Sequence, residues 1–289
     1  MPFAPGAAND IVGRIVLEQV SRQVNKPIVV ENRPGAGGTL GVSAVAKAQP
    51  DGNTILVHSS SFSSAYSLYK NLPYDTLNDF TAVVPLGKTP TVLVVPPSKG
   101  FKTAADLIAA AKAKPGAMNF ASAGIGSVSH LAAERFRLSA GIDAQHVPFR
   151  GPNEAFTELM AGRIDFYFLP LAPALPLVKE GQLLALAVST DTRALALPDV
   201  PTTTELGLKD SSYLFWTGIF VPGKTPRDVI GKLYDESRKA LQVPIVQERL
   251  AKVGTEPMTM STDDFGKYFR EDVVSTAKLM QQVGIKPGE

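Results

Sequence analysis

Four short loops rich in glycine, alanine and serine each lead into a predicted helix. They span residues 5–10, 58–62, 122–127 and 150–153. The first turn of a helix carries unpaired N–H groups and partial positive charge, so it attracts anions. Small side chains let a carboxylate reach those N–H groups. Each loop alone is better explained as a tight turn before a helix, but four of them together favour an anion-binding cleft.

Several side chains near these loops could assist such a site. Asp10 can order the first loop by accepting its N–H groups, or it can simply favour the positive end of the helix. Arg150 can pair with a carboxylate through two hydrogen bonds, although a loop arginine is more often solvated. Phe62, Tyr167 and Phe168 can line a pocket that excludes water. Aromatic residues in strands are usually core residues, and neighbours such as Tyr167 and Phe168 face opposite sides.

An enzyme is the competing hypothesis, and it depends on Ser127 and His130. A histidine can activate a nearby serine, but the sequence places no acid to orient this one. A histidine in the first turns of a helix more often packs or forms hydrogen bonds. The chain has no nucleophile elbow, Walker loop, zinc-protease helix or complete dinucleotide-binding motif. We therefore expect no catalytic activity.

Composition narrows the possibilities further. With no cysteine, the chain cannot form a disulfide or hold a cysteine-ligated metal, and its three histidines would all have to converge in one metal site. We expect neither a metal nor a cofactor. A net charge of +2 gives no general attraction to nucleic acid or a membrane surface. No apolar run reaches the ~18 residues of a membrane span.

The elements that position the loops alternate between helices and short apolar runs, which is typical of an α/β protein. The patterns predict helices over residues 8–24, 39–48, 104–114, 128–138, 152–161, 174–179, 226–241 and 262–283. They predict strands over residues 26–30, 54–57, 91–95, 119–121, 146–149, 165–168, 184–188 and 215–221. Thr103 is expected to cap the helix that follows it, with Asp106 in a capping box.

Two buried-type strands, 91–95 and 217–221, indicate the domain organisation. About 120 residues separate them, enough for a lobe of its own. If the two strands run side by side, the chain crosses from lobe one to lobe two and back, leaving a cleft and a two-strand hinge. The alternative is that both are ordinary strands of one sheet. The two-lobed interpretation places lobe one at residues 1–96 plus 223–289 and lobe two at residues 97–222.

Taken in order, many short segments resemble the Bug-type substrate-binding receptors of tripartite tricarboxylate transporters. The resemblance covers essentially the whole chain, and the order and spacing of the segments are more specific than any one of them. The segments are Pro-Phe-Ala-Pro-Gly at 2–6 with Asp10, residues 30–38, 72–75 with Asp79 and Phe80, 123–127 with His130 and Leu131, 147–151, 185–189, 197–202 with 205–207, and 216–222 with Thr225 and Pro226.

This resemblance implies a type II periplasmic binding-protein fold, in which two α/β lobes are joined by two crossing strands with a ligand cleft between them. It implies a periplasmic monomer that closes on a small organic carboxylate and is then recognised by membrane transporter subunits. A dicarboxylate, a tricarboxylate or an aromatic acid would fit. Neither a nucleic-acid partner nor direct membrane insertion is expected. A sensor that presents its closed form to a signalling partner is an alternative that the sequence cannot separate from transport.

Carried over by position, the resemblance implies that loop 3–10 grips one carboxylate. Ser127 with its preceding loop, segment 59–62 and the turn after Phe168 complete the pocket. The expected ligand-binding residues are Phe3, Ala4, Gly6, Ala7, Ala8, Asn9, Asp10, Ser59, Ser60, Ser61, Phe62, Ser122, Ala123, Gly124, Gly126, Ser127, Arg150 and Phe168.

The sequence departs from the family pattern in two places. Ala7 and Ala8 stand where glycines are common, which narrows the space for a ligand. Members usually have a whole strand before Pro2, so we expect that this strand and any leader are mostly missing here.

Overall fold

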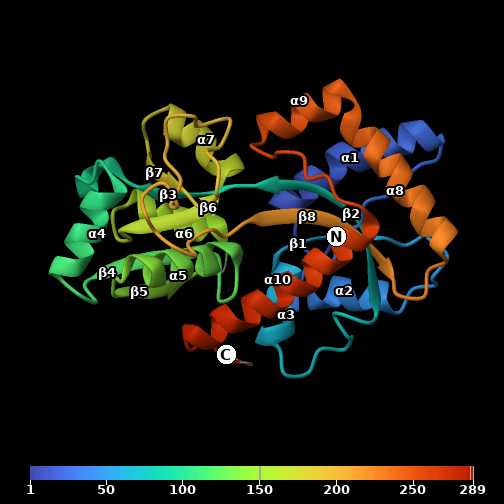
Figure 1. The fold of residues 1–289 in the computed structure, drawn as a ribbon, viewed down its shortest axis with the longest axis horizontal. Helices are drawn as coiled ribbons and strands as arrows, with labels where there is room; N and C mark the ends of the chain where they lie inside the picture. The colour runs from blue at the N-terminus through green and yellow to red at the C-terminus, as the bar shows by residue number, and fades with distance from the viewer. Residues whose placement is uncertain (150, 287, 289) are drawn as a thin grey trace. The chain divides into compact units, whose positions relative to one another are not determined.

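The structure is a computed structural model that describes residues 1–149, 151–286 and 288 (Figure 1). The chain forms two compact units, the first from Met1–Lys88 and Trp216–Glu289, the second from Thr89–Phe215. The chain therefore enters unit 2 between Lys88 and Thr89, where we expected 96 and 97. It returns between Phe215 and Trp216, where we expected 222 and 223.

The sheet of unit 1 has three strands in the order β1-β8-β2. They are β1 (Leu56–Ser59), β8 (Phe215–Pro222) and β2 (Phe80–Thr89). Strands β1 and β8 are antiparallel, with Leu56 opposite Phe220. The Gly223 N–H donates to the Asp79 carbonyl at 2.8 Å, so the end of β8 lies beside the start of β2.

The two strands that carry the chain between the units are therefore β2 and β8, which are neighbours in one sheet. The predicted pairing of strands 91–95 and 217–221 is wrong, and so is their placement in a single sheet. Strand β3 (Thr91–Val95) belongs to the sheet of unit 2, while 217–221 lies within β8. Pro90, which has no N–H to donate to a ladder, separates β2 from β3.

Helices pack on both faces of the unit 1 sheet because side chains alternate along β8. Ile219 and Val221 join one cluster, and Trp216 and Phe220 join the other. The first cluster includes residues of α1 (Ala8–Val24), α8 (Arg227–Gln242) and α9 (Pro244–Lys252). The second includes residues of α2 (Thr39–Ala46), which follows the turn η1 (Ala36–Gly38), and of α3 (Ser61–Leu68) and α10 (Thr262–Gln282).

Gly218 is the position of β8 where a side chain is least tolerated. A Cβ there would lie 2.4 Å from Cζ of Phe265, a fully buried ring, and 3.3 Å from the carbonyl oxygen of Val84. We expect Gly218→Ala to lower the free energy of unfolding by about 1–3 kcal/mol through overpacking. Gly231→Ala in α8 is the control: its methyl would meet no atom within 4 Å. It should raise stability by about 0.5–1 kcal/mol. Equal denaturation midpoints for the two variants would contradict this prediction.

Unit 2 contains a five-stranded sheet in the order β5-β4-β6-β3-β7. Its other strands are β4 (Met118–Ser122), β5 (Ala144–Pro148), β6 (Phe166–Pro170) and β7 (Leu184–Val188). Strand β4 is parallel to β5 and β6, whereas β3 is antiparallel to β6 and β7. The helices are α4 (Ala104–Ala113), α5 (Val128–Ala140), α6 (Pro152–Met160) and α7 (Leu171–Lys179), with the short turn η2 (Pro97–Lys99).

Local signals predicted several details of unit 2 correctly. The capping box of Thr103 and Asp106 is present at the start of α4. Tyr167 lies in the cluster that includes Val92 and Leu169, while Phe168 packs against Phe136 with ring centroids 5.4 Å apart. Neighbouring aromatic residues of β6 thus face opposite sides, as the strand period requires.

The predicted strand 26–30 is absent. These residues form no strand, and Val29 is 81% exposed. Backbone pairing is found just after them, where the Met1 ammonium donates to the Glu31 carbonyl at 2.7 Å and the Arg33 N–H donates to the Met1 carbonyl at 2.9 Å. An apolar, β-branched segment becomes a strand only when a neighbour accepts its backbone groups.

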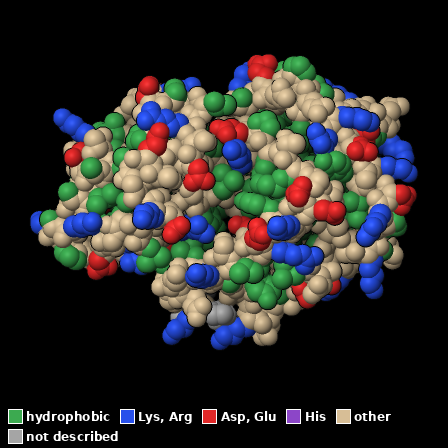
Figure 2. Space-filling model, in the orientation of Figure 1, with side chains coloured by type: hydrophobic (Ala, Val, Ile, Leu, Met, Phe, Trp, Pro, Cys, Tyr) green, Lys and Arg blue, Asp and Glu red, His purple; other side chains and the backbone are tan. Residues whose placement is uncertain are grey.

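The surface is mixed in charge. On the face shown in Figure 2, basic and acidic side chains are interspersed over the described residues, consistent with the net charge of +2. Within the described part of the chain, every helix is too short or too polar to cross a membrane.

Candidate functional site

The first loop, residues 3–10, is held in shape by the carboxylate of Asp10. Its Oδ2 accepts a hydrogen bond from the Gly6 N–H at 2.9 Å, and its Oδ1 accepts one from Asn32 Nδ2 at 2.9 Å. The Asn32 amide also donates to the Phe3 carbonyl at 2.9 Å. Arg14 Nε lies 3.0 Å from Oδ1 of Asp10, whose side chain is only 3% exposed. Asp10 therefore orders the loop, as one of the two hypotheses for it predicted.

Asp10 is ionised at neutral pH. Burial alone would raise the pKa of its carboxyl, but hydrogen bonds from Arg14, Asn32 and the Gly6 N–H outweigh burial and hold the pKa below its ordinary value. A carboxylate so fully engaged has no free oxygen for proton transfer. Its charge is balanced by Arg14, so an anion at this loop would be held by hydrogen-bond donors rather than by net charge.

The N-terminus of α1 presents donors with nothing to donate to. Ala7 caps the helix but has no side-chain oxygen to accept its first N–H groups. Among the described residues, the amides of Ala8, Asn9 and Asp10 have no acceptor, whereas the Ala7 N–H donates to the Ala4 carbonyl at 3.2 Å. The side-chain Nδ2 of Asn9 is also buried without a partner, and Asn9 as a whole is 2% exposed.

The second loop, residues 58–62, lies against the first loop within unit 1. The His58 ring at the end of β1 stacks on Phe62 at 4.7 Å and meets the edge of Phe3 at 5.4 Å. Ser59 and Ser61 share a hydrogen bond between their hydroxyls at 2.8 Å. The Ser60 N–H donates to the Trp216 carbonyl at 3.1 Å. The Ser60 hydroxyl is buried and has no partner among the described residues.

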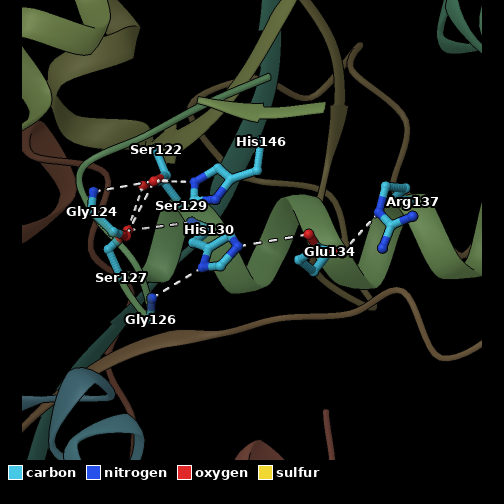
Figure 3. Close-up of polar contacts among 9 residues, drawn as sticks. All are labelled: Ser122, Gly124, Gly126, Ser127, Ser129, His130, Glu134, Arg137 and His146. Atoms are coloured by element: carbon cyan, nitrogen blue, oxygen red, sulfur yellow. Dashed lines mark hydrogen bonds and ion pairs between the residues drawn. The ribbon is translucent and has the colours of Figure 1, made fainter. Parts of the chain in front are cut away.

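The loop before α5 in unit 2 satisfies most of its own amides (Figure 3). The Ala123 N–H donates to Ser129 Oγ at 2.9 Å, and the Gly124 N–H donates to Ser122 Oγ at 3.1 Å. The Gly126 N–H donates to Nδ1 of His130 at 3.0 Å. Three amides expected to face a ligand are thus engaged inside the loop. Among the described residues, the unpaired amides here are those of Ile125, Val128 and Ser129.

Ser127 is the N-cap of α5, and its environment speaks against a serine nucleophile. Its hydroxyl accepts a hydrogen bond from the His130 backbone N–H at 3.4 Å and lies 3.0 Å from Ser129 Oγ. Nδ1 of His130 already accepts from Gly126, so the ring proton resides on Nε2. Neither ring nitrogen of His130 is free to act as a base for Ser127.

Glu134 is the acidic partner of His130 that sequence reasoning missed. Its Oε1 lies 3.6 Å from His130 Nε2, and its Oε2 accepts from Arg137 Nε at 2.8 Å (Figure 3). Burial would raise the pKa of Glu134, but His130 and Arg137 outweigh burial and lower it. The signal was present in the sequence, because residues four apart on a helix are neighbours.

His146 stacks on His130 with ring centroids 3.7 Å apart and planes 10° apart. Its Nε2 lies 2.6 Å from the Ser122 hydroxyl. Burial, aided by the nearby His130, lowers the pKa of His146 to about 4. Because His146 is uncharged at neutral pH, the stacked rings do not repel one another. The hydrogen bond between His146 and Ser122 helps to hold the loop in this conformation.

The histidines should make folding sensitive to acid. Burial also lowers the pKa of His58 to about 3, so both His58 and His146 titrate below the ordinary value of 6.5 in the folded state. Their contribution to stability is complete above that value and is lost as the pH falls toward the folded pKa. Each histidine can cost up to about 1.4 kcal/mol per pH unit in that window.

We therefore expect the urea concentration at the denaturation midpoint to be lower at about pH 5 than at about pH 7. In the variant His146→Gln, this decrease should be smaller. The measurement is urea denaturation of both proteins at the two pH values. If the variant loses as much stability as the parent chain, His146 is not one of the groups responsible.

The remaining predicted residues are not brought into an open site. The side chains of Phe62 and Phe168 are fully buried and Tyr167 is 1% exposed, so these rings offer a ligand no surface in this structure. The expectation of an aromatic lining is corrected accordingly: these rings fill the cores of their units. Arg150 lies outside the described residues. No cluster of three or more potential metal ligands occurs among residues that the structure describes.

Comparison with known proteins identifies the family. Residues 12–285 match the family described as tripartite tricarboxylate transporter family receptor. The chain belongs to this receptor family. The structure is similar to the periplasmic binding protein BugD, with a TM-score of 0.87 and 30% identity over 99% of this chain and 96% of that one. The family expected from the ordered segments is confirmed, and with it the periplasmic binding-protein fold.

The names of two further similar structures include a ligand. The R. palustris protein Rpa4515 with adipate has a TM-score of 0.90 and is 27% identical over 99% of this chain and 96% of that one. MatC from Rhodopseudomonas palustris with bound malate has a TM-score of 0.84 and is 30% identical over 96% of each chain. This receptor is thus similar in structure to the periplasmic binding protein BugD and to two proteins whose structures are named with adipate and with malate.

Proposed function

We propose that this chain is an extracytoplasmic receptor that binds a small dicarboxylate and releases it unchanged to membrane transporter subunits. Adipate and malate, found with the similar proteins, are both short dicarboxylates. The engaged state of Asp10 and of both His130 ring nitrogens supports binding without catalysis. Among the described residues of these loops, a histidine nitrogen does lie beside a serine hydroxyl, His146 Nε2 at 2.6 Å from Ser122. That serine is fully buried and its hydroxyl also donates to the Gly124 carbonyl at 3.1 Å, so it offers a substrate no exposed nucleophile.

The observation that carries this proposal is the set of unpaired donors in the two loops of unit 1. The Asn9 amide nitrogen and the Ser60 hydroxyl are buried without partners among the described residues, and the Ala8 and Asn9 backbone amides add two further donors. A buried polar group without a partner costs roughly 1–3 kcal/mol. A carboxylate has about four acceptor positions, so it would recover that free energy at the N-terminus of α1.

Unit 2 has candidate anion-binding donors of its own at the N-terminus of α5. The donors there are the amides of Ile125, Val128 and Ser129, with Ser127 beside them. The receptor is proposed to capture its ligand by hinge bending at β2 and β8, the two strands that connect the units.

A thermal-shift comparison of adipate with hexanoate tests this proposal. Both have six carbons, but hexanoate has one carboxylate. A ligand at 100 times its Kd stabilises the folded state by about 2.7 kcal/mol. We expect adipate or malate to raise the melting temperature and hexanoate to have a much smaller effect. Absence of a shift with every mono-, di- and tricarboxylate tested would contradict the proposal.

A further inference from the structure

Unit 1 contains a cavity of about 1120 Å³ that involves none of the loops described above. It lies between the end of α3, the segment 69–78 and the C-terminal end of α10. Among the described residues, nothing from loops 3–10 or 58–62 lines it. We propose that this cavity is a second ligand site, for a small anion with a flat aromatic body and a single acidic group.

Aromatic and apolar side chains form much of the wall. Tyr66 and Tyr69 are 47% and 36% exposed, so their rings are available to a ligand. Leu72 adds apolar surface, whereas Met280, at the end of α10, is only 2% exposed and so adds little. Exposed aromatic rings favour contact with a flat aromatic molecule. An extended dicarboxylate would gain little from such a wall, since it has few apolar atoms to bury.

Two buried hydroxyls in the wall have no hydrogen-bond partner among the described residues. They are Tyr74 Oη and Thr76 Oγ1, on residues that are 7% and 1% exposed. The Tyr74 ring is fixed in the core, at 5.7 Å from Phe80 and 6.3 Å from Phe62. Burial raises the pKa of Tyr74, so its hydroxyl keeps its proton and is a donor. A native protein rarely leaves such groups unpaired, so they point to a polar ligand atom in this cavity.

The charges at the cavity favour an anion. Lys70 and Lys286 line it, and neither ammonium has an acidic partner among the described residues. The acidic residue of the wall, Asp75, is already engaged, since its Oδ1 accepts from the N–H groups of Leu77 at 2.9 Å and Asn78 at 3.1 Å. Two free cations against one satisfied carboxylate leave the cavity positive.

Backbone hydrogen bonds hold the chain on both sides of Lys286. The Ile285 N–H donates to the Met280 carbonyl at 2.9 Å, and the Gly288 N–H donates to the Leu68 carbonyl at 2.7 Å. These bonds fasten the segment that carries Lys286 to α10 on one side and to the end of α3 on the other. A Cβ built at Gly288 would lie 3.7 Å from Cδ and Cε of Lys70, so the backbone at Gly288 runs beside the Lys70 side chain.

Isothermal titration with 2-naphthoate tests the proposal. The titration is made on the whole chain, first alone and then with adipate at saturating concentration. We expect binding whose Kd does not change when adipate is added. The double variant Lys70→Ala/Lys286→Ala should weaken it about tenfold or more, the effect of one or two lost charge-assisted contacts.

Two further variants make the test specific. Tyr74→Phe removes only a hydroxyl that has no partner, so it should fold normally and weaken naphthoate about three- to tenfold. The double variant Lys224→Ala/Lys232→Ala removes two exposed lysines of unit 1 elsewhere and should bind as the parent chain does. The proposal is overturned if naphthoate does not bind, if adipate displaces it, or if the Lys70/Lys286 variant binds it normally.

Discussion

Replacing Asp10 with alanine should both destabilise the protein and remove its affinity for dicarboxylates. The variant would leave the Gly6 N–H, the Asn32 amide and the Arg14 guanidinium without the acceptor that they share. Removing one partner of a buried charge pair typically costs about 3–5 kcal/mol. Since Arg14 is 45% exposed and can be solvated, we expect the lower part of that range.

The effect on binding follows from the loop. Gly6, Phe3 and Asn32 are tied together through the Asp10 carboxylate, so its loss frees the segment that precedes the first amides of α1. We expect the Kd for adipate to rise more than tenfold, about 1.4 kcal/mol or more. The measurements are urea denaturation and calorimetric titration.

Asp235→Ala is the matched control for Asp10→Ala. Asp235 is an exposed acid of α8 in the same unit. Its removal should change stability by at most about 0.5 kcal/mol and leave adipate binding as it is. If Asp10→Ala bound adipate like the control, the first loop would not be part of the binding site.

Ser60→Ala should weaken dicarboxylate binding without weakening the fold. The Ser60 hydroxyl is buried and unpartnered among the described residues, so removing it relieves a cost instead of breaking a bond. We expect the free energy of unfolding to stay level or to rise by up to about 1 kcal/mol. If the hydroxyl donates to the carboxylate, the Kd for adipate should rise by roughly three- to thirtyfold. Asn9→Ala should weaken binding in the same direction.

Ser63→Ala is the opposite case and serves as the control. Ser63 is the third residue of α3 and is also fully buried, but its hydroxyl donates to Asp272 at 2.6 Å. Its loss should destabilise the protein by about 1–3 kcal/mol and leave adipate affinity unchanged. If Ser60→Ala instead destabilised the fold like Ser63→Ala and bound adipate normally, the Ser60 hydroxyl would be structural.

Much of the fold was predictable wherever the chain carries a local end signal. Helix α1 spans the predicted residues 8–24, and α4 begins at the capping box of Thr103. Strands β3 and β7 were predicted with their observed bounds because short apolar runs end at proline or at polar residues. In each case the information lies within a few residues of the element.

Elements that depend on distant partners were missed. Strand β2 was not predicted because Pro85, Gly87 and Lys88 interrupt its apolar pattern, and its neighbour β8 lies far along the chain. Only Val243 separates α8 from α9, so the sequence has no loop there that would indicate the start of a second helix. Segment 26–30 shows the reverse error: it has the composition of a strand but no strand neighbour among the described residues.

The candidate site was predictable as a set of loops but not as a set of free donors. The composition of residues 122–127 indicates a loop suited to anions, yet three of its amides donate to Ser122, Ser129 and His130. Which amides remain unpaired depends on side-chain rotamers that spacing does not determine. For the same reason, the sequence distinguishes neither Ser60 from Ser63 nor the core ring of Phe62 from a pocket wall.

A crystal structure of the chain with adipate bound is the most direct test of the receptor assignment. It should place one carboxylate of adipate within hydrogen-bond distance of the Ala8 and Asn9 amides and of Asn9 Nδ2, with the Ser60 hydroxyl also engaged. Adipate bound with neither carboxylate at the N-terminus of α1 would show that the unpaired donors of unit 1 are not the anion site.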